Sequence, residues 1–371
     1  MGDTFPKLFA AVIADRLMDF VVDGKRLSRP QKGFLRHEGC HEHNFALQGI
    51  LEDSKRLGRN VVLGWLDLSN AFGSIPHAVI FDALRGMKIP DEFTDLIINM
   101  NTGATTRVRT REGFTDPIPL KAGVKQGCPA SPIIFNLAME RILRELDRLT
   151  AGYRMGGVSY RSFAYADDVV LVANTPEEMR EMLRIAEEEA VRAGLSFNAA
   201  KCATLHIAGK GAGRRSLPTA FNLSSGAVKA LNDGEGYDYL GIPIGVGVNQ
   251  TPLATIEGMM IDAEKIDGSL LAPWQKIDAL RTFIMPRLDY IMRGGTVNRA
   301  PLSLLDKKIK KLVKGWLHLP QRASAEVVHL PSWRGGAGII PTADLADILT
   351  ISHAFRMLSC RDGIIAGVAR G

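Results

Sequence analysis

The stretch that decides the fold is Phe163-Ala164-Tyr165-Ala166-Asp167-Asp168-Val169-Val170-Leu171-Val172. Apolar, β-prone residues flank the two aspartates, which predicts a strand, a two-residue turn made of Asp167 and Asp168, and a second strand. Turns favour aspartate, so a pair of solvated turn residues is the ordinary interpretation of such a pair. Adjacent carboxylates repel each other, however, so two of them held at a strand end indicate a bound positive charge.

A third carboxylate, Asp67, ends another apolar run, Val61 to Leu66. Two strand ends that present three hard oxygen ligands suit a pair of Mg²⁺ ions, which lie ~3.5–4 Å apart in two-metal sites. Mn²⁺ accepts the same kind of ligand and is the alternative ion. Such a pair of ions promotes phosphoryl transfer, so these residues predict a metal-dependent enzyme.

The composition is that of an ordinary globular protein. The 371 residues are 46% hydrophobic and 23% charged, which suits two or three domains of about 150 residues each. No run approaches the ~18 apolar residues of a membrane span, and the start of the chain does not resemble a signal peptide. The scattered cysteines fit a reducing compartment. We therefore expect neither a membrane partner nor secretion.

Basic charge is concentrated in one C-terminal segment. The formal net charge is +6, while residues 271–334 hold twelve Lys or Arg against four Asp or Glu, a balance of +8. The remainder of the chain is therefore slightly acidic. A basic segment of this kind predicts a polyanionic partner such as nucleic acid.

Two other patterns are interpreted as structural. The cluster His37-Glu38-Gly39-Cys40-His41-Glu42-His43 is too crowded for the spacing of a tetrahedral zinc site. The run Gly209-Lys210-Gly211-Ala212-Gly213 lacks the spacing of a phosphate-binding loop. We expect the first run to be a loop within the first sixty residues and the second run to be a basic surface loop.

Periodicity predicts a mixed α+β region up to about residue 250, followed by helices. The apolar stripe Leu8, Phe9, Val12, Ile13, Leu17 and Phe20 predicts an N-terminal helix. Further predicted elements are a helix from Asn44 to Leu57, a helix from Asp91 to Met100, a hairpin near 104–121, a helix capped by Ser131 and reaching Leu149, a helix from the capping box Thr175-Pro176-Glu177-Glu178 to Gly194, and an apolar-striped helix over 302–316.

An ordered set of motifs runs through the α+β region: Asp67-Leu68-Ser69-Asn70-Ala71-Phe72, Gly123-Val124-Lys125-Gln126-Gly127-Cys128-Pro129, Tyr165-Ala166-Asp167-Asp168, Gly194 to Lys201, and Tyr239-Leu240-Gly241. This set resembles palm motifs A to E of reverse transcriptases. The Asn198-to-Cys202 run and Trp316-Leu317-His318-Leu319-Pro320 resemble non-LTR (LINE-type) retrotransposons, closest to the site-specific lineage that inserts into ribosomal RNA genes.

The resemblance implies an α+β right-hand polymerase with an antiparallel palm sheet and an all-helical thumb. Residues 1–60 would be N-terminally incomplete fingers, 61–248 the palm with an interleaved fingers hairpin near 104–121, and 249–371 a helical thumb with a C-terminal extension. The chain resembles a fragment that lacks endonuclease and zinc-finger segments. After Ala71-Phe72, many relatives carry Asp where this chain has Gly73, which should loosen a turn and spare the chemistry.

The resemblance also implies roles for individual residues. Asp67, Asp167, Asp168 and the backbone carbonyl of Leu68 would hold the metals, and Lys201 would protonate the leaving pyrophosphate. An isolated lysine at such a place is otherwise a surface residue. The remaining implied residues are Ala71, Phe72, Gln126, Gly127, Lys7 and Arg36 for the nucleotide, with Arg16 and Lys32 as further basic candidates; Tyr239, Leu240 and Gly241 for the primer grip; and Gly123, Lys307, Lys308, Lys311 and Lys314 for nucleic acid.

Two of these roles compete with simpler interpretations. An aromatic ring at Phe72 would clash with a ribose 2′-hydroxyl and favour deoxynucleotides, but Phe72 also suits the core of the following helix. Gly123 and Gly127 would let the backbone approach the template closely, but glycines also form ordinary turns. Lysines on the helix over 302–316 would follow the phosphates of a duplex, although a solvated helix face carries the same residues.

The function implied is that of an RNA-directed DNA polymerase acting in target-primed reverse transcription, with an RNA template, a DNA primer and dNTPs as partners. The expected place of action is the nucleus, with a cytoplasmic ribonucleoprotein as a further state. The alternative is an inactive retroelement relic that binds nucleic acid without copying it. The enzyme is favoured because drift would erode an unused site, whereas five site residues are intact: Asp67, Gln126, Asp167, Asp168 and Lys201.

Overall fold

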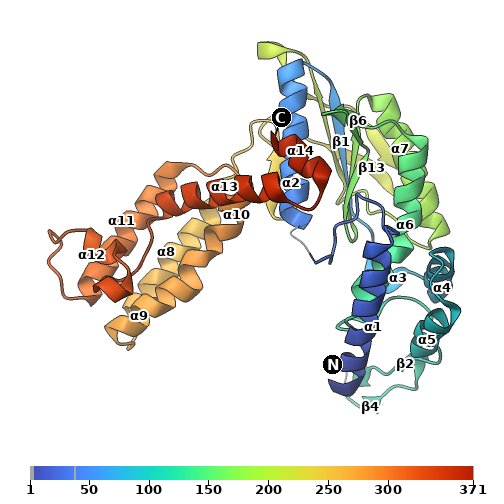
Figure 1. Ribbon diagram of the computed structural model, residues 1–371, viewed down its shortest axis with the longest axis horizontal. Helices are drawn as coiled ribbons and strands as arrows, with labels where there is room; N and C mark the ends of the chain where they lie inside the picture. The colour runs from blue at the N-terminus through green and yellow to red at the C-terminus, as the bar shows by residue number, and fades with distance from the viewer. Residues whose placement is uncertain (1–3, 37–38, 371) are drawn as a thin grey trace. The chain divides into compact units, whose positions relative to one another are not determined.

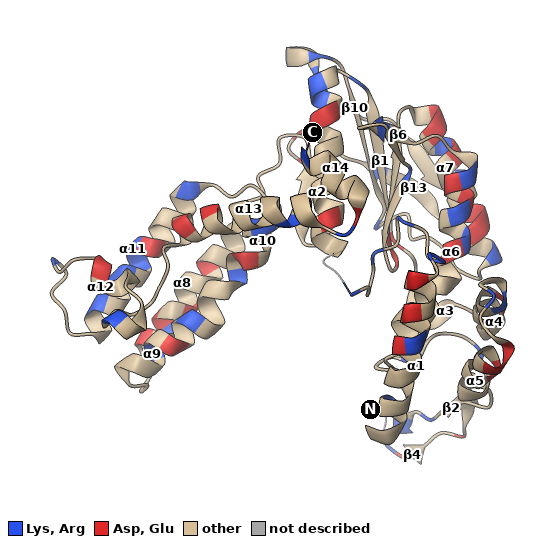
Figure 2. Cartoon of the chain, in the orientation of Figure 1, with Lys and Arg blue, Asp and Glu red and all other residues tan. Residues whose placement is uncertain are grey.

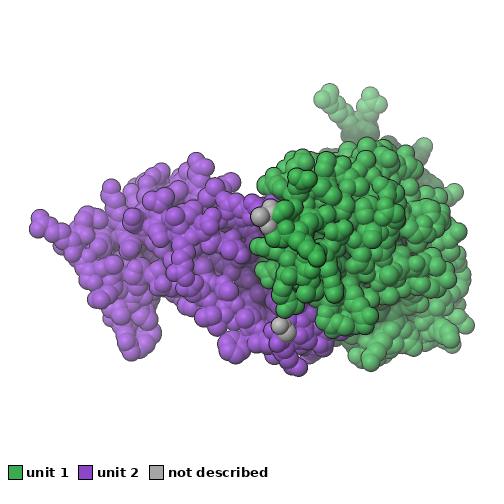
Figure 3. Space-filling view, turned by 90° about the horizontal axis from the view of Figure 1, so that it is seen from above, with its two compact units in different colours: residues 1–43, 47–237 green, residues 44–46, 238–371 purple. Residues whose placement is uncertain are grey.

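The computed structural model describes residues 4–36 and 39–370 and divides the chain into two compact units (Figures 1 and 3). The first unit extends to Tyr237, except that residues 44–46 group with the second unit, which begins at Asp238. The predicted start of the thumb at residue 249 lies about ten residues later, because the hairpin after Tyr237 packs within the second unit. The assignment of fingers, palm and thumb stays a prediction. His37 and Glu38 lie outside the described residues.

One sheet forms the centre of the first unit, in the strand order β12-β13-β10-β1-β9-β8, with β11 paired to β10. All of these pairings are antiparallel except β10 with β13. The central strand β1 is buried along its whole length, as its apolar run predicts. The strands are β1 (Val61–Leu66), β8 (Ser162–Tyr165), β9 (Asp168–Ala173), β10 (Ala203–Ala208), β11 (Arg215–Leu217), β12 (Phe221–Leu223) and β13 (Gly226–Ala230).

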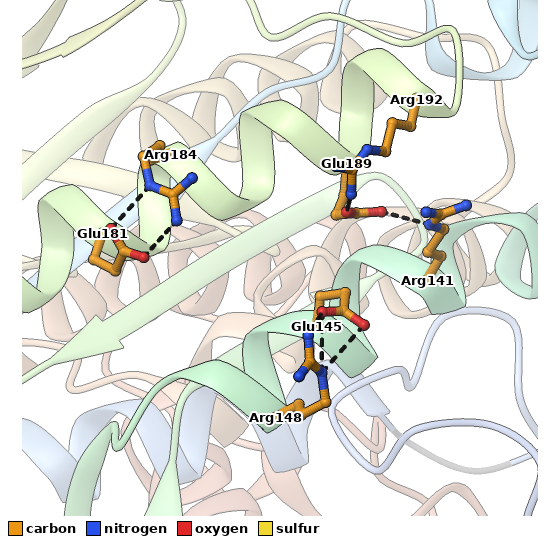
Figure 4. A network of polar contacts seen from close by, with 7 residues as sticks. All are labelled: Arg141, Glu145, Arg148, Glu181, Arg184, Glu189 and Arg192. Atoms are coloured by element: carbon orange, nitrogen blue, oxygen red, sulfur yellow. Dashed lines mark hydrogen bonds and ion pairs between the residues drawn. The ribbon is translucent and has the colours of Figure 1, made fainter.

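Helices α6 (Ser131–Leu149) and α7 (Pro176–Arg192) pack against each other and against the sheet. Figure 4 shows Glu189 of α7 held between two arginines, with its Oε2 2.5 Å from Arg141 Nε of α6 and its other oxygen on Arg192. Glu189 is buried whereas both arginines reach solvent. This contact joins the two helices. The ion pair Arg148–Glu145 lies within α6, and the ion pair Arg184–Glu181 lies within α7.

The capping predictions for these two helices have opposite outcomes. Thr175 caps α7 by accepting a 3.2 Å hydrogen bond from Glu178 N, and Gly194 follows its end at φ +68°, as predicted. Figure 2 shows the mixed charges along this helix. The predicted Ser131 cap of α6 is wrong. Its hydroxyl instead donates to the carbonyl of Lys125, which anchors the preceding glycine-rich turn.

The N-terminal helix is longer than its buried stripe. Ile13 and Leu17 are buried as predicted, but Leu8, Phe9 and Val12 are exposed, because the first turns of the helix extend past the core. The predicted hairpin near 104–121 is confirmed as two short paired steps. The remaining elements of this unit are α1 (Thr4–Asp23), α2 (Gly39–Leu57), α3 (Ala71–Ser74), α4 (His77–Gly86), α5 (Asp91–Asn101), β2 (Thr105–Thr106), β3 (Arg109–Thr110), β4 (Gly113–Phe114), β5 (Ile118–Pro119), β6 (Tyr153–Met155), β7 (Val158–Tyr160) and the short 3₁₀ turn Gly211–Gly213.

In its described residues, the second unit is helical apart from the hairpin of β14 (Gly236–Tyr239) and β15 (Ile242–Gly245), of which Gly236 and Tyr237 group with the first unit. Its core is a separate apolar cluster built largely from α8 and α11. Within the described residues, no helix is long and apolar enough to span a bilayer. The helices are α8 (Leu253–Asp267), α9 (Pro273–Ala279), α10 (Asp289–Gly294), α11 (Arg299–Trp316), α12 (Glu326–His329), α13 (Thr342–Ser359) and α14 (Gly363–Arg370), with shorter turns at Leu280–Ile284, Met285–Leu288 and Ser332–Arg334.

Candidate active site

Three aspartates meet at one end of the central strands. In the pairing of β1 with β9, Leu66 faces Val169, so the next residues, Asp67 and Asp168, follow at the same edge. Asp168 pairs with Tyr165 as the first residue of β9. The predicted turn is therefore shifted by one residue: the two turn residues are Ala166 and Asp167, and Ala166 takes the left-handed conformation at φ +56°.

The charges of the aspartates affect one another. Burial raises the pKa of Asp167, and the charge of Asp67 adds to the effect. Burial, followed by the charges of Asp167 and Asp67, raises the pKa of Asp168 to about 6, although this side chain keeps an exposed face. Like charges held together in this way favour either a proton or a cation between them.

The donor set fits a hard divalent cation, because it consists of carboxylate oxygens. Asp67 Oδ2 is buried without a hydrogen-bond partner, which is the state of an atom that a cation would satisfy. Among the described residues, no three His, Cys, Asp or Glu side chains are grouped closely enough to form a ready-made metal cage.

The segment after Asp67 pairs with the segment that carries Lys201. Ser69 N donates to Ser196 O at 2.8 Å and Asn198 N donates to Asp67 O at 2.9 Å. Because backbone groups alternate along an extended chain, the carbonyl of Leu68, which lies between these two bonds, points to the opposite side, where β9 lies. The predicted metal carbonyl therefore faces the side of Asp168.

Lys201 and Cys202 both contact Asp67. Lys201 Nζ lies 3.7 Å from Asp67 Oδ2, so the structure brings these two predicted site residues together. Cys202 is buried, and its Sγ accepts a 3.3 Å hydrogen bond from Asp67 N. Sequence reasoning gave Cys202 no role in the site. Its position directly after Lys201 was the available signal.

Phe72 is packed between aromatic rings. Its ring stacks on Phe135 at a centroid distance of 4.3 Å, and Phe34 meets it edge-on at 6.3 Å. Phe72 is half-buried, so it belongs to the core in part and keeps an accessible face as well. Ala71 beside it is buried, so its side chain is not available to a nucleotide.

The glycine-rich turn is tied to the segment after Asp67. Val124 N donates to Phe72 O and Gly123 N donates to Ile75 O, both at 2.8 Å. A Cβ on Gly123 would lie 2.9 Å from Gly73 O, so this glycine permits a close approach to Gly73. The two glycines therefore pack together, and the roles predicted for Gly123 at the template and for Gly73 in loosening a turn stay predictions.

The neighbouring Gln126 and Gly127 are exposed. Gly127 has φ +79° with open space around its Cα, so its positive φ alone requires glycine. Both residues are therefore accessible to a nucleotide, as their predicted role requires.

Sequence reasoning took only Lys32 and Arg36 of the segment 30–36 into the site, but the backbone of this segment lies against the turn that carries Asp167. Lys32 N donates to Ala164 O, and Ala164 N donates to Pro30 O, both at 2.9 Å. Gln31 is buried and reaches the backbone of Ala166. Phe34 packs near Phe72 and Tyr165. The signal available in the sequence was the polar residue Gln31 between Pro30 and Gly33.

The basic residues predicted for the triphosphate are largely engaged. Arg36 is exposed but pairs with Asp15 at 2.7 Å and Asp19 at 2.8 Å, and these two carboxylates raise the pKa of Arg36. Lys32 is buried in an ion pair with Glu42, so its ammonium is not open to a ligand. Lys7 and Arg16 lie on α1, where Arg16 is exposed and Lys7 is partly so.

In the second unit, the lysines of α11 differ from one another. Lys307 and Lys311 are exposed, and Lys308 pairs with Glu264. Lys314 is buried, and its Nζ donates to the carbonyls of Gln321 and Ala323 at 3.1 and 2.7 Å. The prediction that Lys314 contacts phosphate is corrected, because its ammonium group is buried and already hydrogen-bonded to these two carbonyls.

The predicted primer grip forms the turn between β14 and β15. Tyr239 is buried, Leu240 adopts φ +47° and Gly241 φ +76°. The hydroxyl of Tyr290 donates to the carbonyl of Leu240 and thereby holds the turn. Leucine rarely adopts a positive φ, so the packing around it must maintain this conformation.

A largely antiparallel central sheet with acidic residues at adjoining strand ends suits a nucleotide polymerase. The family model "Reverse transcriptase (RNA-dependent DNA polymerase)" matches residues 4–244, so the chain belongs to this family, and the predicted right-hand polymerase fold and enzyme class are confirmed. It is 32% identical over 331 residues to the Pol polyprotein of the type-2 retrotransposable element R2DM of Drosophila melanogaster.

A second relative is the Pol polyprotein of the R2 element of Nasonia vitripennis, at 29% identity over 343 residues. Each alignment covers 89% of this chain, and the chain spans 31% and 32% of these relatives, about a third of their length. The predicted likeness to non-LTR retrotransposon reverse transcriptases is confirmed. Among solved structures, the apo telomerase of Candida tropicalis has a TM-score of 0.49 and 12% identity, covering 97% of this chain and 60% of that one.

Proposed function

We propose that this chain copies RNA into DNA by adding dNTPs to a primer 3′-hydroxyl through two-metal phosphoryl transfer. The observation that carries the proposal is the position of Asp67, Asp167 and Asp168 at one sheet edge. There burial and the charge of Asp67 raise the pKa of Asp167 and of Asp168, and Asp67 Oδ2 is buried without a hydrogen-bond partner. Structural carboxylates normally find hydrogen-bond donors, whereas these lie where a cation is needed.

Asp67, Asp167, Asp168 and the carbonyl of Leu68 would hold two Mg²⁺ ions, with Mn²⁺ as the alternative. When bound, such ions activate the attacking hydroxyl and stabilise the leaving pyrophosphate. Lys201 Nζ, beside Asp67, holds the proton that passes to the pyrophosphate oxygen as the bond to the α-phosphorus breaks. This lysine is the residue of the site best placed for general acid catalysis.

The other residues bind and orient. The accessible face of Phe72 excludes a ribose 2′-hydroxyl, and Gln126 and Gly127 bind the sugar and base of the nucleotide. Lys7 and Arg36 attract the triphosphate, with Arg36 exchanging its present carboxylate partners for phosphate oxygens. The turn at Tyr239 to Gly241 positions the primer end. Lys307, Lys308 and Lys311 neutralise phosphates of the duplex.

In its biological setting, the chain would act in target-primed reverse transcription of a retrotransposon RNA. Its partners would be that RNA and a DNA primer, with the nick made by an endonuclease outside these residues. The site of action would be the nucleus, where integration takes place, and a cytoplasmic ribonucleoprotein would precede it. The similarity to R2 Pol polyproteins supports this setting.

Primer extension tests the proposal. Oligo(dT) annealed to poly(A) is incubated with the protein, Mg²⁺, and either dTTP or UTP. We expect extension with dTTP and none with UTP. Asp167→Ala should abolish extension while duplex retention on a filter stays unchanged, and Asp95→Asn, in an exposed position on α5, is the matched control. Full extension by Asp167→Ala refutes the assignment. Duplex binding without extension by the unmodified protein supports the inactive relic instead.

A further inference from the structure

The segment 30–34 covers the free edge of the strand that leads into the catalytic turn. Strand β8 is the last strand of the sheet, so one of its edges lacks a strand partner. Gln31 forms a parallel bridge with Ala164 of β8, through the backbone bonds that Pro30 and Lys32 make to Ala164. A loop distant in sequence is therefore fixed next to Asp167 and Asp168.

The side chain of Gln31 binds both backbone groups of Ala166. Its Oε1 accepts from Ala166 N at 2.9 Å and from Gly33 N at 2.9 Å, and its Nε2 donates to Ala166 O at 3.4 Å. Gln31 is 2% exposed and Ala166 is also 2% exposed, so solvent does not replace these bonds. The amide of one glutamine thus satisfies the buried turn.

Ala166 needs such support because of its conformation. The left-handed conformation is unfavourable for a residue other than glycine, and Ala166 has φ +56°. The backbone conformation of Ala166 sets the direction in which the chain continues, and therefore the direction of the Asp167 and Asp168 side chains. The space is also tightly filled, since a Cβ on Gly33 would lie 2.3 Å from Ala166 N.

We propose that Gln31 is a positioning residue for the polymerase reaction: by holding Ala166 in the left-handed conformation, it aims the carboxylates of Asp167 and Asp168 at the cation. This inference rests on the proposed function, because it concerns the same site. Gln31 does not touch a substrate or a reacting atom. It acts through the geometry of the turn, so its loss changes how well the carboxylates bind a divalent ion.

Gln31→Met tests the inference, because methionine keeps the length and removes both hydrogen-bonding atoms. Binding of Mn²⁺ to the protein without substrate is followed by the electron paramagnetic resonance signal of free Mn²⁺. The Mg²⁺ dependence of dTTP incorporation is measured in parallel. Loss of a residue that orients metal ligands weakens metal binding about 10- to 100-fold, and we expect at least a tenfold rise in the Mn²⁺ dissociation constant and in the Mg²⁺ half-saturation concentration.

Gln250→Met is the matched control. Gln250 also bridges two backbone groups, accepting from Thr296 N at 2.7 Å and donating to Pro243 O at 3.0 Å, but in the second unit. Because Gln250 is only partly buried, its replacement should lower thermal stability by less than that of Gln31, and it should leave Mn²⁺ affinity unchanged. If Gln31→Met does not fold by circular dichroism, Gln31→Glu replaces it, because glutamate keeps the accepting oxygen and loses the donor to Ala166 O. We expect the same direction of change.

Mn²⁺ affinity within twofold of the unmodified protein in the folded variant overturns the inference. An equal weakening by Gln250→Met does so as well, because the effect is then one of general stability. The fate of the proposed function is judged separately. Should Asp167→Ala abolish extension while Gln31→Met binds Mn²⁺ normally, only the positioning role of Gln31 is lost.

Discussion

Replacing Asp168 with asparagine should stabilise the metal-free protein, because it removes a carboxylate whose charged form is disfavoured first by burial and then by the charges of Asp167 and Asp67. The pKa of Asp168 is raised from 3.8 to about 6 by burial and by Asp167 and Asp67. A shift of one pKa unit corresponds to about 1.4 kcal/mol, so the whole shift sets an upper bound of roughly 3 kcal/mol. Solvent reaches the exposed face of Asp168 and screens the charge, so we expect about 1 kcal/mol.

The pH dependence has a defined sign. The folded-state pKa of Asp168 lies above its unfolded value, so the native state binds the proton more tightly. The stability that this group contributes is therefore fully present below pH ~3.8 and is lost as pH rises to about 6. Asp168→Asn has no carboxylate at this position, so its stability does not fall as the pH rises through this range. The advantage of the variant should develop between these pH values and remain constant above them.

Thermal unfolding of the two proteins in EDTA measures this effect. About 1 kcal/mol raises the Tm of a unit of 150–250 residues by roughly 2–4 °C, so we expect a gain of that size at pH 7.5 and none at pH 3.5. Adding Mg²⁺ should stabilise the unmodified protein more than the variant. Asp95→Asn should show neither effect. A variant that is less stable in EDTA at pH 7.5, or a gain that persists at pH 3.5, would contradict the idea that these carboxylates repel one another.

Three other changes test separate parts of the structure. Gly33→Ala should destabilise the first unit by about 1–3 kcal/mol through overpacking, because its Cβ would meet the backbone of Ala166 and Tyr165; urea unfolding measures this, and an unchanged midpoint argues against the close packing. The double variant Lys307→Gln, Lys311→Gln should reduce the slope of log binding constant against log salt concentration for duplex binding by about 2. Lys314→Met should leave this slope unchanged and lower the Tm, since Lys314 is buried. If Lys314→Met altered the slope, Lys314 would contact phosphate after all. Phe72→Val should admit UTP in primer extension, and continued exclusion of UTP would place the sugar discrimination at another residue.

The local chemistry of the site could be predicted from residues close together in sequence. The apolar run before Asp67 and the apolar residues around Asp167 form the central strands, because burial on both faces favours such runs. The boundary of the turn that carries Asp167 was misplaced by one residue. Periodicity does not distinguish Asp168 as the first strand residue from Asp168 as the last turn residue, and the β-pairing of Tyr165 with Asp168 decides it.

The sequence by itself determined the family, many of the helices and strands, and the aspartates that lie at the sheet edge, since each depends on motifs or periods within a few residues. Only the tertiary structure showed that Gln31 holds Ala166, that Cys202 holds the backbone of Asp67, and that Lys314 is buried. The partners of Gln31 and of Cys202 lie more than a hundred positions away in the sequence, so no local pattern predicts them. The burial of Lys314 likewise depends on how the surrounding segments pack. Hydrogen bonds to a buried turn depend on which segment the fold places beside it.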